Sequence, residues 1–264
     1  MSKVSVIIPA YNCAEYVRKT VDSILAQTYK DVEVIVVNDG SQDETQSILE
    51  SYGHQIHLIN KQNGGVSSAR NAGLDAASGD YIMFLDSDDY LDFDCIERAI
   101  REGTDIVRFP FLWEYPDGSV VRGKMLFEEE TCILKPDFPK YIYPQFLDGI
   151  NFNSVCGTIF RSGIIGDMRF RTDMKTAEDA VFSVEAYTRA NSFVFVPDVF
   201  YHYTKSGGGL TGAALSVKEK YRCNYKLSKY MISKLSQWGM NTCLNRFRAL
   251  FRLVRITLDK IRRG

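Results

Sequence analysis

The chain has 264 residues, of which 45% are hydrophobic and 25% charged, and its formal net charge at pH 7 is −1. This ordinary globular composition excludes a wholly disordered or fibrous protein, and the near-zero charge gives no reason to expect a nucleic-acid partner. The length allows one large α/β domain, or one domain with an appended helical piece.

Between residues 3 and 85, short β-branched runs alternate with segments of helical period, which is typical of βαβ units and a parallel sheet. The predicted strands are residues 4–8, 32–37, 56–59 and 81–85, and the predicted helices carry residues 17–25, 48–49 and 66–77. The segment Ser41 to Glu44 has the S-x-x-E form of a capping box, which we expect to open the second helix.

Polar clusters follow three of these strands, namely Tyr11-Asn12, Asp39 and the run Asp86 to Asp89. If the strands are parallel, the clusters gather along one edge of the sheet. Open α/β sheets bind ligands at that carboxyl edge, so the sequence predicts a binding site there.

From residue 104 the pattern becomes less regular. We expect β-like runs at 105–111 and 119–127, a helix at about 180–190, a further β-like run at 193–203 and a glycine-rich loop at 206–209. The remainder is predicted to be helical to the end of the chain.

The segment Leu85-Asp86-Ser87-Asp88-Asp89 presents carboxylates two residues apart directly after an apolar strand. Mg²⁺ and Mn²⁺ take oxygen ligands, commonly one or two carboxylates together with the phosphates of a substrate. An isolated D-x-D is also a common polar turn before a helix, so this motif alone leaves both interpretations open. It is not an EF-hand, because Tyr90 stands where that loop needs Asp or Asn.

Five blocks occur in order: Val4-Ser5-Val6-Ile7-Ile8-Pro9-Ala10-Tyr11-Asn12, Val34-Ile35-Val36-Val37-Asn38-Asp39-Gly40-Ser41, Asn63-Gly64-Gly65 with Ala69-Arg70-Asn71-Ala72-Gly73, Gly79-Asp80-Tyr81-Ile82, and Phe84-Leu85-Asp86-Ser87-Asp88-Asp89. Together they resemble the family 2 inverting glycosyltransferases over roughly residues 3–95. The resemblance implies the glycosyltransferase A fold, a Rossmann-like nucleotide-binding α/β/α sandwich with a mixed central sheet, here followed by a C-terminal helical extension.

The resemblance also implies donor-binding residues, which are Pro9, Tyr11, Asn12, Glu15, Asp39, Arg70, Asp86, Asp88 and Lys205. In the family, the segment matching Pro9–Asn12 lies against the nucleobase, Asp39 accepts a hydrogen bond from the base, and Asp86 contacts the ribose. Asp88 would hold Mn²⁺ or Mg²⁺. Without the resemblance, the residues around Asp39 also fit a turn with a helix cap, and Arg70 also fits a partner of surface carboxylates.

An inverting transfer needs a base that takes the proton of the acceptor hydroxyl. The segment Lys175 to Ala180 resembles the family's E-D pair, which implies Asp179 as the base, and a neighbouring acid helps by raising its pKa. From the residues alone, this segment is also a good helix start with an acidic first turn. The segment Tyr201 to Lys205 resembles, more weakly, one that covers the donor diphosphate. There Lys205 meets phosphate, and His202 is either a further metal ligand or a packed strand residue.

The expected activity is single transfer of a sugar from a nucleoside diphosphate sugar, with UDP the expected nucleotide, to a hydroxyl of a glycan or lipid-linked acceptor in surface-polysaccharide synthesis. The alternative is a catalytically silent nucleotide-sugar-binding partner of another transferase. A sugar-nucleotide pyrophosphorylase is disfavoured, because the first strand leads into Pro9–Asn12 and not into a glycine-rich phosphate loop. We divide the chain into a catalytic domain at 1–205, with a donor half (1–103) and an acceptor half (104–205), and a helical extension at 206–264.

The six cysteines include no C-x-x-C pair, so neither a zinc site nor a disulfide framework is expected and a cytoplasmic location fits best. We expect no signal peptide and no spanning helix. Residues 246–263 hold seven basic residues against Asp259, beside an apolar stripe. This stripe either contacts the inner face of the cell membrane or packs on the domain or on a second copy in a homodimer.

Overall fold

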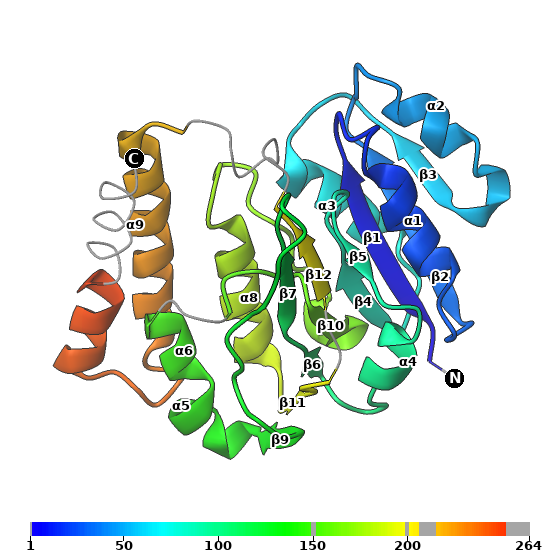
Figure 1. The fold of residues 1–264 in the computed structure, drawn as a ribbon. Coiled ribbons are helices and arrows are strands. Elements are labelled where there is room, and N and C mark those ends of the chain that lie inside the picture. Colours follow the sequence, from blue (N-terminus) through cyan, green and yellow to red (C-terminus); the bar gives the residue numbers. More distant parts are fainter. Residues whose placement is uncertain (1, 149–151, 199–200, 206–214, 252–264) are drawn as a thin grey trace.

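A computed structural model describes residues 2–148, 152–198, 201–205 and 215–251. A central eight-stranded sheet has the order β3-β2-β1-β4-β10-β6-β11-β9 and carries helices on both faces (Figure 1). Its strands are β1 (Val4–Ala10), β2 (Val32–Asn38), β3 (His57–Asn60), β4 (Tyr81–Phe84), β6 (Ile106–Arg108), β9 (Thr131–Leu134), β10 (Thr158–Arg161) and β11 (Ser192–Phe195). The α/β class that the sequence predicts is confirmed.

The first four strands are parallel, as their helical connections predict. β1 pairs in parallel with β2 and with β4, and β2 pairs in parallel with β3. β10 then runs antiparallel to both β4 and β6, and β9 runs antiparallel to β11. The sheet is therefore mixed, with the parallel strands β3-β2-β1-β4 on one side and strands of both directions on the other.

Alternate residues of the strands face the two helical layers, as the period of two in a strand requires. On β1, Ile7 belongs to the core under α3, whereas Val6 and Ile8 belong to the core under α1. The helices are α1 (Val17–Leu25), α2 (Thr45–Glu50), α3 (Val66–Ala76), α4 (Cys95–Ala99), α5 (Phe138–Tyr141), α6 (Tyr143–Asp148), α7 (Ser162–Ile165), α8 (Glu178–Arg189) and α9 (Val217–Lys234), with short 3-10 turns η1 (Gly53–Gln55) and η2 (Lys135–Asp137).

A second sheet of four strands, which the sequence did not predict, has the order β5-β12-β7-β8. Its strands are β5 (Tyr90–Leu91), β7 (Phe111–Glu114), β8 (Val120–Arg122) and β12 (Tyr201–Thr204). The predicted runs 105–111 and 193–203 are each divided between the two sheets, at Pro110 and at Pro197. Because β12 pairs with β5, this sheet lies directly behind the Asp86–Asp89 turn.

The predicted capping box at Ser41–Glu44 is wrong. Helix α2 begins at Thr45 with Glu44 as its N-cap and no side-chain capping bond, because the Ser41 hydroxyl accepts the Asn12 N–H instead. A capping box does form at the start of α9, between Ser216 and Glu219.

The C-terminal region is helical over α9 and again over residues 243–251. The predicted loop at 206–209 and the stripe beyond residue 251 lie outside the described residues. In the described part of that stripe, Phe247 and Phe251 are 61% and 51% exposed. Among the helices that the structure describes, none has the length and apolarity required to cross a membrane. The boundary at residue 205 stays a prediction.

Candidate active site

The predicted nucleobase segment lies where β1 ends beside β2. Pro9 is buried in the strand, Tyr11 is half-buried, and Asn12 has a left-handed backbone with φ 47°. The Asn12 side-chain oxygen accepts the Gln42 N–H at 2.8 Å, which ties the end of β1 to the loop after β2. Glu15 lies exposed in the turn before α1.

Asp39 follows β2 and is 2% exposed. Its carboxylate accepts hydrogen bonds from Lys61 Nζ at 2.5 Å, the Gly64 N–H at 3.0 Å and the Gly65 N–H at 2.7 Å. Asp39 therefore holds the Gly64-Gly65 turn that opens α3. If Asp39 contacts a nucleobase as the sequence predicts, the base is bound by the same carboxylate in addition to these three donors.

Arg70, on the buried face of α3, joins three acidic side chains. Its Nη1 donates a short hydrogen bond to Asp179 Oδ1, its Nη2 donates to Asp86 Oδ1 at 2.8 Å, and Glu178 Oε1 lies 3.8 Å from Nη1. The Arg70 side chain is only 4% exposed, so these ion pairs form around a buried guanidinium. Arg70 thereby holds Asp86 and Asp179 close together, although they lie more than 90 positions apart in the sequence.

Packing and backbone bonds fix the place of Arg70. Its guanidinium carbon lies 5.3 Å from the centroid of the Phe170 ring, which stacks on Phe182 of α8 at 4.1 Å. The next residue, Asn71, donates from Nδ2 to the Phe170 carbonyl at 2.9 Å and accepts the Phe170 N–H at 2.7 Å. Helix α3 is thus fastened to the segment that leads into α8.

Burial raises the pKa of Asp179 to about 7; Arg70 opposes this shift, whereas the negative charges of Glu178 and Asp86 reinforce it. A carboxylate with a pKa near the working pH is suited to general base catalysis, because it is both available and able to hold a proton. The side chain remains 17% exposed. Asp179 can therefore receive a proton from a group outside the protein.

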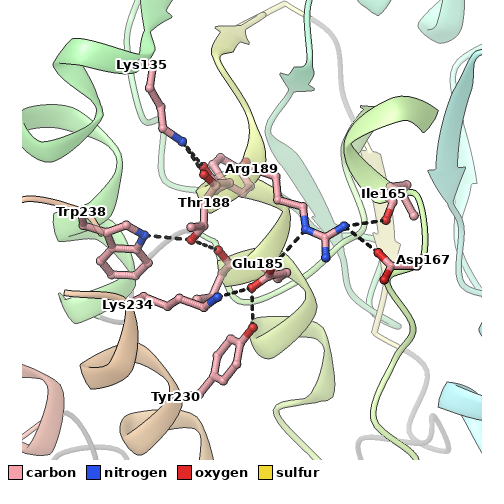
Figure 2. Close-up of polar contacts among 11 residues, drawn as sticks. Lys135, Ile165, Asp167, Glu185, Thr188, Arg189, Tyr230, Lys234 and Trp238 are labelled. Atoms are coloured by element: carbon pink, nitrogen blue, oxygen red, sulfur yellow. Dashed lines mark hydrogen bonds and ion pairs between the residues drawn. The ribbon is translucent and has the colours of Figure 1, made fainter. Parts of the chain in front are cut away.

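The helix that carries Asp179 is anchored at its other end (Figure 2). Glu185 binds Lys234 at 2.6 Å and Tyr230 at 2.5 Å, both on α9. Beyond α9, Trp238 Nε1 donates to the Thr188 hydroxyl at 2.8 Å. Lys135 Nζ caps the C-terminal carbonyls of α8, Thr188 and Ala190 among them, where a cation is favoured by the helix dipole.

Two non-glycine residues of the described chain have positive φ, Asn12 at 47° and Ala177 at 64°. Ala177 is the N-cap of α8 and stands immediately before Glu178 and Asp179. A left-handed alanine is unfavourable by about 1–2 kcal/mol, and such strain gathers at functional sites. Both residues flank the predicted site.

Sequence reasoning missed Asp89 and Tyr201. Asp89 is 1% exposed and accepts the Tyr201 hydroxyl at 2.6 Å and the Thr204 N–H at 2.9 Å, while the Tyr201 oxygen accepts the Asp86 N–H at 3.1 Å. Burial raises the pKa of Asp89 to about 9, and the charges of Asp86 and Asp88 reinforce this. The available signal in the sequence was the third Asp of the run Asp86-Ser87-Asp88-Asp89.

His202 and Lys205 lie on or next to β12. His202 Nδ1 is 2.9 Å from Glu114 Oε1 and its Nε2 is 3.0 Å from Asp92 Oδ1, so both ring nitrogens face carboxylates and the ring stacks on Tyr90. This arrangement matches the packed strand residue better than the metal ligand. Lys205 Nζ lies 4.4 Å from the centroid of the Trp113 ring, and its backbone continues from Thr204, which bonds Asp89.

A divalent cation fits the Asp86–Asp88 turn in its chemistry. Both side chains are partly exposed at the end of β4 and offer the oxygen ligands that Mg²⁺ and Mn²⁺ prefer. Within the described residues, no three His, Cys, Asp or Glu side chains gather as a metal-binding group. The turn therefore suits an ion that takes its remaining ligands from a phosphorylated substrate.

The chain is similar in sequence and in fold to known proteins. Glycosyltransferase GlyA of Streptococcus pneumoniae serotype 4 is 29% identical over 79% of this chain and 31% of its own length, and chondroitin synthase of Pasteurella multocida is 48% identical over 38% of this chain and 11% of its own. The structure of S. aureus TarS 1-349 in complex with UDP-GlcNAc superposes with a TM-score of 0.68 and 26% identity, covering 86% of this chain and 66% of TarS 1-349.

The chain thus spans less than two thirds of each of these proteins. The likeness to TarS confirms the predicted glycosyltransferase A type of α/β fold with a mixed central sheet. The model of the family described as "Glycosyl transferase family 2" matches residues 5–165, which is more than half of the chain. The protein belongs to glycosyl transferase family 2.

Proposed function

We propose that the protein transfers a sugar from a UDP-sugar to an acceptor hydroxyl with inversion at the anomeric carbon. Asp179 takes the proton of the acceptor hydroxyl as its oxygen attacks the anomeric carbon, and the nucleoside diphosphate leaves. Asp86 receives the ribose, and the Pro9–Asn12 segment with Asp39 receives the base. The acceptor that we infer is a glycan or a lipid-linked glycan of surface-polysaccharide synthesis.

The observation that carries the proposal is the Arg70 bridge. One buried guanidinium binds both Asp86, from the predicted donor motif, and Asp179, from the predicted base motif. Two motifs that lie far apart in the sequence are joined through this one side chain, which supports a single site. This favours an enzyme over the catalytically silent binding partner, because the partner has no use for a base beside its donor.

Asp88 would hold Mn²⁺ or Mg²⁺, with Asp86 next to it. When bound, such an ion neutralises the charge of the departing diphosphate. The residues of the chain orient the donor and remove the proton. We infer that Lys205 meets the donor phosphate; the support is that it directly follows Thr204, whose N–H donates to Asp89.

Calorimetry of UDP with Mn²⁺ tests the donor site. We expect binding by the wild type, and a tenfold or greater loss for Asp88→Ala. Asp117→Ala serves as the matched control, because Asp117 is an exposed carboxylate in the β7–β8 turn. Equal and metal-independent binding by Asp88→Ala would refute the assignment of Asp88.

Turnover tests the base. UDP or GDP release from a panel of nucleotide sugars in the presence of Mn²⁺ should identify the donor, and Asp179→Asn should lower that release by at least 100-fold. Its UDP affinity should stay within threefold of the wild type. Unchanged release by this variant would assign the base elsewhere, and no release by the wild type with intact UDP binding would favour the silent partner.

We also infer peripheral contact with an anionic membrane through residues 246–263. The support is the exposure of Phe247, Leu250 and Phe251 together with the basic excess of this segment. Cosedimentation with phosphatidylglycerol vesicles should be lost in Phe247→Ser/Phe251→Ser and kept in Leu134→Ser, which changes an exposed apolar residue elsewhere. Equal sedimentation of all three would remove the idea, and concentration-dependent dimerisation that the double variant abolishes would support a homodimer instead.

A further inference from the structure

Arg70 is the one cation that the structure shows in contact with both Asp86 and Asp179, among the described residues. Its two terminal nitrogens bind different carboxylates: Nη2 donates a hydrogen bond to Asp86, and Nη1 donates one to Asp179. A guanidinium is a rigid planar fork, so the two carboxylates that it binds are held at a fixed separation. A lysine, which presents a single point charge, cannot do this.

We propose that Arg70 is a positioning residue that holds the donor-side carboxylate and the base carboxylate in one geometry, and that it does not bind donor phosphate. The inference rests on the proposed function, and it changes the role expected for Arg70 from a donor contact to an organiser of the base.

Burial supports this role. The Arg70 side chain is 4% exposed, less than either Asp86 at 33% or Asp179 at 17%. Its remaining nitrogen, Nε, is buried without a hydrogen-bond partner, and one face of the guanidinium is covered by Phe170. A ligand that enters the site therefore meets the two carboxylates before it meets the guanidinium.

The surroundings of Asp179 determine what the bridge does to its proton affinity. The charged groups that act on it are Arg70 on α3, Asp86 after β4 and Glu178 on its own helix, and the Val155 N–H also donates toward it. The buried thiol of Cys156 is close to the same cluster. Arg70 and the Val155 N–H favour the charged form of Asp179, whereas the two acids disfavour it. Removing the charge of Arg70 and removing the charge of an acid therefore shift the Asp179 pKa in opposite directions.

The experiment measures the titration of the Asp179 carboxyl by ¹³C NMR, on protein labelled at aspartate and with the signal assigned by its loss in Asp179→Asn. Arg70→Met should raise the Asp179 pKa by about one to two pH units, because a charge-assisted hydrogen bond is lost. Glu178→Gln should lower it. Arg169→Met is the matched control, because this nearby arginine pairs with Asp75, and it should leave the pKa in place.

Calorimetry with UDP and Mn²⁺ supplies the second readout. Arg70→Lys should keep UDP affinity within threefold of the wild type while lowering turnover by at least 30-fold, because one of two bonds is lost. An unchanged Asp179 pKa in Arg70→Met, or a UDP affinity reduced more than tenfold in Arg70→Lys, would overturn the proposal and return Arg70 to donor binding.

If Arg70→Met does not fold, Glu178→Gln and Arg70→Lys carry the same test. In that case, an Asp179 pKa that does not fall in Glu178→Gln would count against the proposal. Absence of UDP binding by the wild type would defeat the proposed function, but the shifts in the Asp179 pKa would still report the bridge. The two failures are therefore distinguishable.

Discussion

Replacing Gly73 by alanine tests how closely α3 must lie on β1. A Cβ added at this glycine would stand 2.3 Å from Cγ2 of Ile7 and 3.3 Å from its Cγ1. Carbon atoms normally pack at about 3.5–4.0 Å, so α3 would have to move outward by roughly 1 Å. Ile7 cannot yield easily, because it is fully buried in β1 between β2 and β4.

Two effects set the size of the change. Overpacking of this kind costs about 1–3 kcal/mol, and alanine in a helix interior recovers about 1 kcal/mol relative to glycine. We expect a net loss of up to about 2 kcal/mol in the free energy of unfolding. Arg70 lies one turn earlier on the same helix face, and a displacement of about 1 Å at a reacting group lowers turnover by roughly 100-fold.

Urea denaturation and nucleotide release measure the two effects. Gly163→Ala in α7 is the matched control, because a Cβ there meets nothing within 4 Å, and it should be neutral or slightly stabilising. If Gly73→Ala unfolds at the same urea concentration as Gly163→Ala and keeps its turnover, the close approach of α3 to β1 has no energetic consequence and the reasoning fails.

Three further predictions concern the supports of the site. Tyr201→Phe leaves the buried Asp89 carboxyl short of a donor and should lower the free energy of unfolding by about 1–3 kcal/mol, measured by urea denaturation; an unchanged value would show that this bond does not stabilise the fold. Trp238→Phe removes the hydrogen bond to Thr188 and should cost about 2 kcal/mol in the same assay, whereas a neutral result would show that Trp238 does not anchor α8. Burial alone would raise the pKa of Glu185, but bonds from Lys234, Tyr230 and Arg189 lower it from 4.5 to about 2. Its stabilising effect is therefore present above pH 4.5 and lost as pH falls toward 2, so thermal unfolding of Glu185→Gln should depend less on pH across that window than the wild type.

The N-terminal half of the fold was predictable because its information is local. Strands β1 to β4 and helices α1 and α3 appear within one or two residues of the predicted bounds, since each has an unbroken apolar period and a short connection. Asp39 and the Asp86–Asp88 turn then fall at one edge as the geometry of parallel strands requires. The role of Asp179 came only from the resemblance, because a helix with an acidic first turn has the same sequence pattern.

The second sheet was not predictable in this way. β7 pairs with β12, and Trp113 and Tyr203 are 90 positions apart in sequence, so nothing in either run indicates its partner. Pro110 and Pro197 are signals that each run changes direction, but they do not show that the continuation joins another sheet. The link between Tyr201 and Asp89 was missed for the same reason.

The Tyr201 hydroxyl limits where this chain can be divided. The family match ends at residue 165, yet the hydroxyl that supports the backbone of Asp86 and the carboxyl of Asp89 is supplied from β12. A fragment cut at the end of the match would keep every residue of the D-x-D motif but would lose the Tyr201 hydroxyl that supports it. The N-terminal segment is therefore not an exchangeable part: transplanting it between relatives requires that β12 be transferred with it.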